Sequence, residues 1–223
     1  MRYAPTLLSA LLVLAACKKD PVDPVDLGYR YFPVQVGHWV EYEVDSVWYD
    51  QFVNVSGTRS YRLRELLLED FTDAAGRTAQ RIHRFVQDST GGWRIRDVWW
   101  QVRDNYAAER TEEDQRRLKL SFPVRNDRTW NVNNYNPGRV TTVRYKNVDA
   151  SATLNGLFFD STATVLGTYP NNLVDTLIYE ERYAKRVGLV YKYQVESNTQ
   201  FVGGMYRTRG WKLRMQAVAF GQE

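Results

Sequence analysis

The sequence is poor in the residues that build metal and redox sites. Its 223 residues include one cysteine, Cys17, and two histidines, His38 and His83. One cysteine allows no disulfide within the chain, and two histidines far apart fall short of the clustered ligands of a structural metal site. We therefore expect no metal and no cofactor, and a fold that is stabilised by packing and by backbone hydrogen bonds.

Familiar catalytic motifs are also missing. The sequence contains no Gly-x-Ser-x-Gly, His-Glu-x-x-His, Walker or Gly-x-Gly-x-x-Gly pattern. Neighbouring residues of a strand point to opposite faces, so the carboxylates of Glu180 and Glu181 cannot act on one substrate. The run 112–114 (Glu-Glu-Asp) lies between Arg110 and Arg116–Arg117 and is interpreted as a solvated charged turn. We expect a protein that is not an enzyme.

The charge is close to balanced, with 30 basic and 26 acidic residues and a net charge of +4. The basic residues alternate with acidic ones along the chain, whereas nucleic-acid binding needs a concentrated basic face. Nucleic acid is therefore not an expected partner.

The longest apolar run lies at the N-terminus. Arg2 precedes the stretch 7–16 (LLSALLVLAA), which is shorter than the roughly 20 residues that span a bilayer. A charged start, a short apolar stretch and small residues before Cys17 are typical of a secretion signal. The sequence Leu-Ala-Ala-Cys resembles the bacterial lipobox, in which the cysteine is acylated with chains such as palmitate after the preceding residues are removed.

This resemblance implies a lipid anchor at Cys17 and a partner membrane that holds the acyl chains. In enterobacterial lipoproteins an Asp after the lipid-bearing cysteine causes retention in the inner membrane. Here Lys18 occupies that position, which favours the outer membrane. We expect residues 1–16 to be a signal peptide. Residues 17–28 would be the lipidated cysteine and a semi-rigid linker, because 20–26 reads DPVDPVD. Residues 29–223 would be the folded domain.

Within that domain, apolar and polar residues alternate with a period of two. Alternation with β-branched and aromatic residues predicts half-buried strands. The predicted strands are 38–50, 58–70, 78–87, 93–103, 106–111, 116–122, 139–149, 153–166, 173–186, 188–200 and 205–219. No stretch predicts an amphipathic helix, and we interpret 109–119 as a charged hairpin tip. We therefore expect an all-β fold, a single antiparallel domain of about eleven strands that forms a curved half-barrel or a barrel-like sandwich.

Three motifs resemble a group of envelope lipoproteins of Bacteroidota. They are YFPV at 31–34 with GHWVEY at 37–42, FPV at 122–124 with Trp130, and AKRVGLVY at 184–191. The group carries no assigned activity. Physically, the motifs look structural: Pro and Gly set turns, and Trp39 and Trp130 are expected in the core.

Two features are candidates for binding or modification. Trp99 and Trp100 are adjacent, so one of them is expected on the less buried face, either as a stacking platform for a glycan or apolar ligand or covered by a loop. Separately, four Asp-Ser/Thr sites resemble the O-glycosylation sequon of Bacteroidota, and their acceptors are Ser46, Ser89, Ser161 and Thr176. The alternative is that Asp-Ser pairs simply stabilise turns. Intact-mass analysis that finds only the acylated polypeptide would exclude glycosylation.

Three functional hypotheses stay open. The leading one is a lipid-anchored, non-catalytic binding or accessory module whose partner is a lipid, a glycan or another envelope protein. The second is a lipid or lipoprotein carrier, which requires a sizeable apolar cavity in the curved sheet. The third is a carbohydrate-active enzyme, which requires two carboxylates facing each other across an open cleft.

Overall fold

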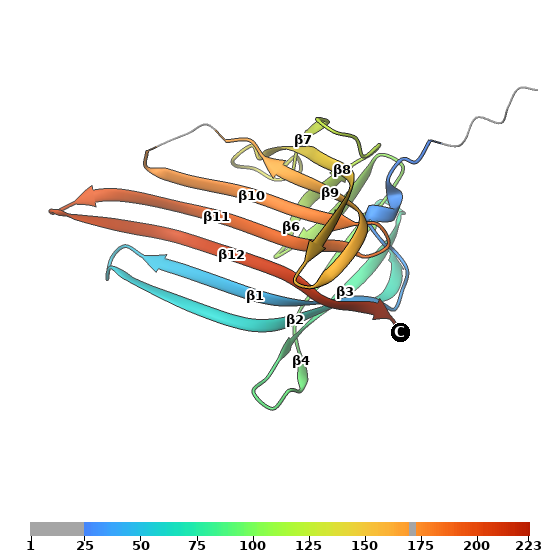
Figure 1. Ribbon diagram of the computed structural model, residues 1–223, viewed down its shortest axis with the longest axis horizontal. Helices are drawn as coiled ribbons and strands as arrows, with labels where there is room; N and C mark the ends of the chain where they lie inside the picture. Colours follow the sequence, from blue (N-terminus) through green and yellow to red (C-terminus); the bar gives the residue numbers. More distant parts are fainter. Residues whose placement is uncertain (1–24, 170–172) are drawn as a thin grey trace, which may run out of the picture.

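The computed structural model describes residues 25–169 and 173–223, and these form an all-β fold (Figure 1). The expected signal peptide, Cys17 and most of the expected linker lie outside the described residues. A single antiparallel sheet holds twelve strands, and the described part contains one short 3-10 helix, η1 (Tyr29–Tyr31). The strands are β1 (His38–Asp50), β2 (Val55–Thr72), β3 (Thr78–Gln87), β4 (Trp93–Arg103), β5 (Ala107–Glu112), β6 (Gln115–Ser121), β7 (Thr129–Asn131), β8 (Thr142–Leu154), β9 (Leu157–Gly167), β10 (Asp175–Ala184), β11 (Gly188–Val202) and β12 (Met205–Gln222). No helix of the described residues is long and apolar enough to cross a membrane.

The sheet order explains how the fold closes. From one edge to the other, the strands run β6-β5-β4-β3-β2-β1-β12-β11-β10-β9-β8-β7, so the first and last strands pair at the centre. The two edge strands, β6 and β7, are neighbours in sequence. They approach each other where the Leu118 N–H donates to the Val132 carbonyl at 2.9 Å and the Trp130 indole N–H donates to the Leu118 carbonyl at 3.0 Å. The twisted sheet is therefore a nearly closed barrel.

The sequence predictions agree with this architecture. All eleven predicted strands are present, and the bounds of β1, β3 and β4 match the prediction. The predicted charged hairpin tip is the β5–β6 turn, where Glu113 and Asp114 both have positive φ. The strand that the sequence missed is β7, because three residues are too few to display a period of two.

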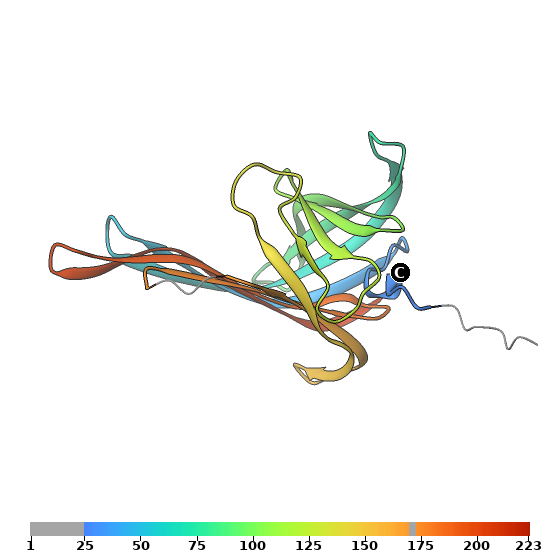
Figure 2. The ribbon, with the colours of Figure 1, turned by 90° about the horizontal axis from the view of Figure 1, so that it is seen from above.

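Five strands continue beyond the barrel as a flatter ribbon, which Figure 2 shows in profile. Strand β2 pairs with β3 only from Leu63 onwards, and β10 pairs with β9 only from Glu180 onwards. The remaining parts of β2, β1, β12, β11 and β10 pair only among themselves. We call this region, residues 46–62, 173–179 and 195–213, the sheet extension.

The N-terminal segment closes the other end of the barrel. Tyr31 and Phe32 are buried, the Arg103 guanidinium donates to the carbonyls of Tyr29 and Phe32, and the Gln101 amide donates to the carbonyl of Pro33. The YFPV motif therefore fills this end of the barrel, and we call residues 31–34 the N-terminal plug. The opposite end of the barrel, beside the sheet extension, is open.

The two expected core tryptophans differ in position. Trp130 is 8% exposed and packs at a centroid distance of 4.4 Å from Tyr145 in the larger apolar cluster, as predicted. Trp39 is only half-buried, and the Arg64 guanidinium lies 4.6 Å from the centre of its ring. The prediction of a core position is therefore wrong for Trp39, which packs under a surface arginine.

Candidate functional site

Four charged side chains meet inside the barrel and form what we call the charged quartet: Glu112 of β5, Lys119 of β6, Glu181 of β10 and Lys192 of β11. The Lys119 ammonium lies 2.6 Å from Glu181 and 3.2 Å from Glu112, and the Lys192 ammonium lies 3.5 Å from Glu112 and 3.8 Å from Glu181. Two positive and two negative charges thus neutralise one another where water is scarce. Removing one partner would leave a buried charge uncompensated.

The quartet keeps its carboxylates ionised. Burial alone would raise the pKa of Glu181, but the ammonium groups of Lys119 and Lys192 hold it below its ordinary value. The same two lysines outweigh burial at Glu112 and hold its pKa well below the usual range. Burial lowers the pKa of Lys119, yet Glu112 and Glu181 raise it overall. The Tyr183 hydroxyl also donates to Glu181 at 2.6 Å.

A second buried cluster of charges, made of Glu65, Arg84 and Arg110, lies inside the barrel. The Glu65 carboxylate accepts from the Arg84 guanidinium at 3.1 Å and from that of Arg110 at 2.8 Å. Burial opposes ionisation of Glu65, but these two arginines lower its pKa. The cavity beside this group is about 30 Å³, so the interior holds paired charges and little free space. The interpretation of 112–114 as a solvated turn is therefore wrong for Glu112, whose side chain is 16% exposed, and correct for Glu113 and Asp114.

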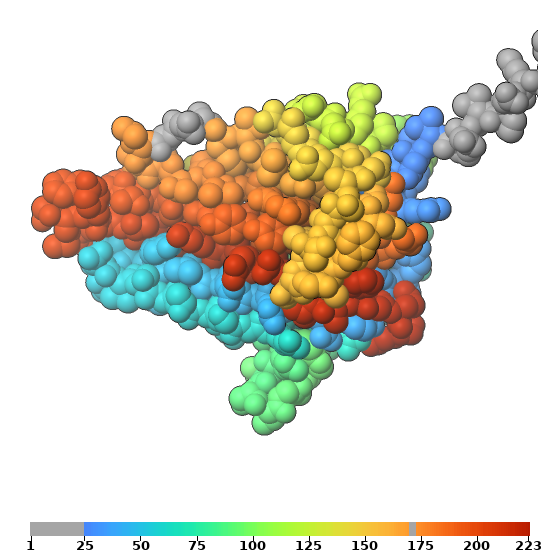
Figure 3. Space-filling view, viewed as in Figure 1, coloured from blue at the N-terminus to red at the C-terminus, as the bar shows by residue number. Residues whose placement is uncertain are grey.

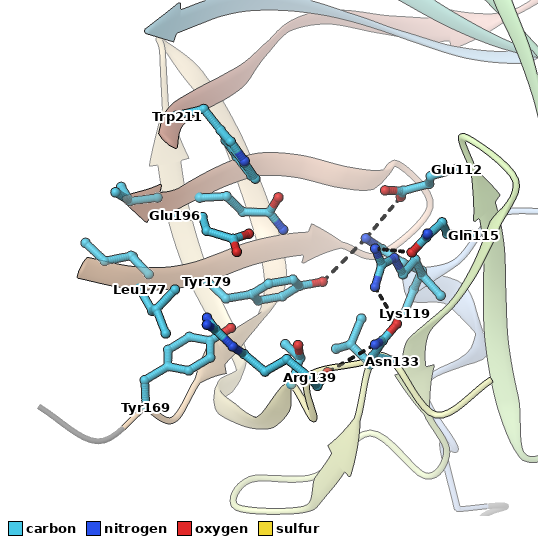
Figure 4. A pocket seen from close by; sticks show the side chains of 16 residues that line it. Glu112, Gln115, Lys119, Asn133, Arg139, Tyr169, Leu177, Tyr179, Glu196 and Trp211 are labelled. Carbon is cyan, nitrogen blue, oxygen red and sulfur yellow. Dashed lines mark hydrogen bonds and ion pairs between the residues drawn. The ribbon is translucent and has the colours of Figure 1, made fainter. Parts of the chain in front are cut away.

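A half-open pocket of about 260 Å³ occupies the open mouth of the barrel (Figure 4). Its floor contains Glu112 and Lys119 of the quartet, and Tyr179 also lines it. The other lining residues come from β6, the 132–141 segment, Tyr169, and the start of the sheet extension: Gln115, Arg117, Val132, Asn133, Arg139, Thr141, Leu177, Ile178, Gln194, Val195, Glu196 and Trp211. The mouth therefore combines aromatic rings, amides, arginines and the carboxylates of Glu112 and Glu196.

Two arginines of the mouth have no carboxylate partner among the described residues. Arg117 donates to the amide oxygens of Asn133 at 2.6 Å and Gln115 at 2.8 Å, and Arg139 makes no ion pair with any described residue. By contrast, the nearby Lys119 is neutralised within the quartet. Guanidinium groups bind carboxylates, sulfates and phosphates well because their planar N–H groups donate in pairs.

The pocket continues onto the concave face of the sheet extension. A second hollow of about 370 Å³ shares Arg139, Leu177, Glu196 and Trp211 with the first. The backbones of β11 and β12 approach each other closely here. A Cβ at Gly210, which has φ +124°, would lie only 2.1 Å from the Glu196 carbonyl oxygen. The two hollows together form what we call the mouth groove, which suits an extended ligand better than a compact one.

The two tryptophans considered as a stacking platform lie elsewhere. Trp99 and Trp100 are on opposite faces of β4 and both are half-buried. The Arg84 guanidinium lies 3.4 Å from the centre of the Trp99 ring, and Trp100 packs edge-on against Phe71. Neither lines the mouth groove. Sequence reasoning missed Trp211 as a site residue, although the alternation of 211–219 places it on the inner face.

The four proposed glycosylation acceptors differ in accessibility. Ser89 and Thr176 are exposed. Ser46 is half-buried and donates to the Arg59 carbonyl, and Ser161 is half-buried and donates to Asp149 at 2.8 Å. The Asp88 side chain accepts from the backbone N–H groups of residues 90 and 92, as the turn interpretation of this sequon expects.

The two histidines do not meet. The His38 Nε2 lies 2.9 Å from the Val187 carbonyl, and burial lowers the pKa of His38. His83 lies beside the Phe85 ring. Within residues 25–169 and 173–223, no group of three or more His, Cys, Asp and Glu side chains could hold a metal ion.

Comparison with known proteins adds little to this geometry. No family model and no curated protein sequence matches the chain. Among solved structures, the chain is similar to a proposed lipoprotein from Parabacteroides distasonis at 9% sequence identity and a TM-score of 0.37, over 86% of this chain and 98% of that one. At this identity and score, the likeness carries no argument about function.

Proposed function

We propose that this chain is a lipid-anchored protein of the bacterial envelope that binds an acidic oligosaccharide, without catalysis, in its mouth groove. Arg117 and Arg139 would bind the carboxylate or sulfate of the ligand. The ring of Trp211 would stack against the apolar face of a sugar, because the C–H groups of a pyranose pack well on an aromatic surface. Gln194 would bind its hydroxyl groups, and the buried Asn133 would hold Arg117 in place.

The observation that carries this proposal is the pair of mouth arginines without carboxylate partners. The buried charges of the barrel are neutralised by neighbours, as in the charged quartet and around Glu65, whereas these two guanidinium groups line the groove unpaired with any described carboxylate. An anionic group of a ligand would form charge-assisted hydrogen bonds with Arg117 and Arg139 at little cost in rearrangement. Two connected hollows would accept more than one sugar unit.

Residence in the envelope rests on the sequence. Cys17 after the apolar segment is the expected acylation site, and Lys18 favours the outer membrane. Two or more acyl chains would anchor the protein stably, since each buried methylene contributes about 0.8 kcal/mol.

The two other hypotheses receive less support. A lipid carrier requires an apolar cavity, whereas buried apolar side chains and paired charges fill the barrel interior, and the mouth mixes charged and aromatic residues. A glycosidase requires a carboxyl group with a raised pKa as its proton donor. The pKa of Glu112 at the floor of the mouth is instead lowered.

The experiment is a binding survey of the chain from residue 18 onwards, which contains every residue of the described fold. An array of matched neutral, carboxylated and sulfated oligosaccharides would identify a ligand, and calorimetry would measure its affinity. We expect acidic members to bind, and Arg139→Gln or Trp211→Ala to weaken that binding about tenfold or more.

Two matched variants serve as controls. Arg94→Gln removes an exposed arginine of β4 that lines neither hollow, and Trp48→Ala removes the tryptophan that pairs with Trp211 across β1 and β12 but lines neither hollow. Both should bind like the unchanged chain. Equal affinity for neutral and acidic members, or an Arg139→Gln variant that binds normally, would contradict the proposal.

A further inference from the structure

Two neighbouring hairpin tips at the far end of the sheet extension expose apolar side chains. In the β1–β2 turn, Phe52 is 83% and Val53 is 65% exposed, and in the β11–β12 turn, Phe201 is 65% and Tyr206 is 73% exposed. Figure 3 shows the β11–β12 tip projecting from one end of the molecule. Soluble proteins seldom gather this much exposed apolar surface without a use for it.

The tips are also free of charge. No charged side chain occurs in residues 51–58 or 197–206. The tips are held together, because the Arg207 guanidinium donates to the Gln51 carbonyl at 3.0 Å. Within the β11–β12 tip, the rings of Phe201 and Tyr206 pack with centroids 5.2 Å apart. They therefore form one uncharged end of the molecule.

Two arginines of β12 lie next to this uncharged end. Arg207 pairs with Gln200 in the β11–β12 ladder, and Arg209 follows it. Gly203 in the turn is three residue steps beyond Gln200, which is about 10 Å at the rise of a strand. The nearest acidic residue of the β1–β2 tip, Asp50, uses its carboxylate to accept from the Phe52 N–H within its own turn. The arrangement is an apolar tip about 10 Å deep with a collar of arginines.

We propose that these two tips insert into the interface of a lipid bilayer that carries anionic headgroups. The depth of the tip matches the roughly 5–10 Å to which interfacial segments bury their apolar side. At that depth, Arg207 and Arg209 lie at the level of the headgroups, where cations bind phosphate, and the Tyr206 ring suits the boundary between water and lipid. The β1–β2 tip, whose Gln51 carbonyl accepts from Arg207, enters less deeply than the β11–β12 tip.

A bilayer fits this shape better than a protein partner does. The tips are convex turns, and a fluid interface receives them without a matching hollow. A stable protein interface instead needs about 800 Å² of complementary surface on each side. Two short turns offer little area of that kind.

The proposal is independent of a ligand in the mouth groove, but it sets the orientation of an anchored chain. The tips and the N-terminal plug lie at opposite ends of the fold (Figure 1). Nine residues connect Cys17 to Asp26 and span at most about 30 Å. A chain anchored at Cys17 whose tips also insert would therefore lie along the membrane.

The test uses the chain from residue 18 onwards, which has no cysteine. Phe201→Cys then accepts a single environment-sensitive NBD label. Phe158→Cys is the matched control, since Phe158 is 68% exposed near the turn of another hairpin, β8–β9. With vesicles of phosphatidylethanolamine and phosphatidylglycerol, we expect NBD emission to rise several-fold at position 201 and to stay unchanged at position 158.

Sedimentation with the same vesicles tests the side chains themselves. The double variant Phe52→Ser/Phe201→Ser should lower the vesicle affinity about tenfold or more, and Phe158→Ser should leave it unchanged. Because these side chains are exposed, the variants should retain the circular dichroism of the parent chain. Unchanged emission at position 201, an equal rise at position 158, or a rise without lipid that follows protein concentration would each overturn the proposal, the last by indicating a second copy of the chain as the occupant.

Discussion

The ammonium group of Lys119 lies 2.6 Å from the carboxylate of Glu181, and neither side chain is more than 3% exposed. The two residues are 62 positions apart in sequence and come from strands that are not neighbours in the sheet. Their contact exists only because the sheet curls until β6 faces β10. The Lys119–Glu181 ion pair can therefore form only when the barrel is closed.

Lys119→Met should destabilise the fold by about 3–5 kcal/mol, because it leaves the buried carboxylates of Glu112 and Glu181 with one lysine instead of two. The measurement is the free energy of unfolding in urea. Arg62→Met is the control, since its ion pair with Glu43 is about half exposed. It should change the stability by no more than about 1 kcal/mol. Equal effects of the two variants would show that the quartet does not stabilise the barrel.

Stability should fall on acidification below the ordinary pKa of a glutamate. The pKa values of Glu112, Glu181 and Glu65 are lowered in the fold from a usual value of 4.5. A lowered pKa adds stability that is fully present above the unfolded value and is lost as the pH falls towards the native one. Urea midpoints measured from neutral pH down to about pH 3 should decline below pH 4.5. The urea midpoint of Glu112→Gln should decline less steeply as the pH falls. An equal slope would show that ionisation of Glu112 does not contribute to the pH dependence.

Trp130→Phe should cost about 1–2 kcal/mol, because it removes the indole N–H that donates to the Leu118 carbonyl where the barrel edges meet. Hydrogen exchange of the Leu118 amide, which bonds to Val132 across the same seam, should become faster. Trp39→Phe is the matched control, since the ring of Trp39 is half-buried outside the seam. It should leave exchange at Leu118 unchanged, and a similar acceleration would show that the seam is not held by Trp130.

Cys17 should carry the acyl chains of the anchor. Cells that express the full chain and are fed an alkyne analogue of palmitate should incorporate it into the protein, and Cys17→Ser should abolish the incorporation. An unlabelled parent chain would show that the protein carries no such lipid anchor. Label that persists in the Cys17→Ser variant would show that the acyl chain is attached to another residue.

Strand positions were predictable because alternation is a local property. The runs around Tyr42 and Tyr191 each carry one apolar and one polar face, and each is a strand. Barrel closure was not predictable, since the contact of Leu118 with Val132 depends on twist accumulated over twelve strands.

The site was harder to predict for a related reason. In sequence, Glu112 and Lys119 belong to a charged run of the kind that is usually solvated. Their burial follows from partners on β10 and β11 that no local pattern reveals. Similarly, adjacency puts Trp99 and Trp100 on opposite faces of a strand without showing which ring is covered. Only the fold shows that Arg84 covers the Trp99 ring while Trp211 lines the mouth groove.

The most direct test of the central claim is native mass spectrometry of the protein purified from its own envelope. We expect a second species whose added mass is that of a bound acidic saccharide. This species should be absent when Arg117→Gln and Arg139→Gln are combined. A bare polypeptide mass for both chains, or the same added mass in both, would contradict ligand binding in the mouth groove.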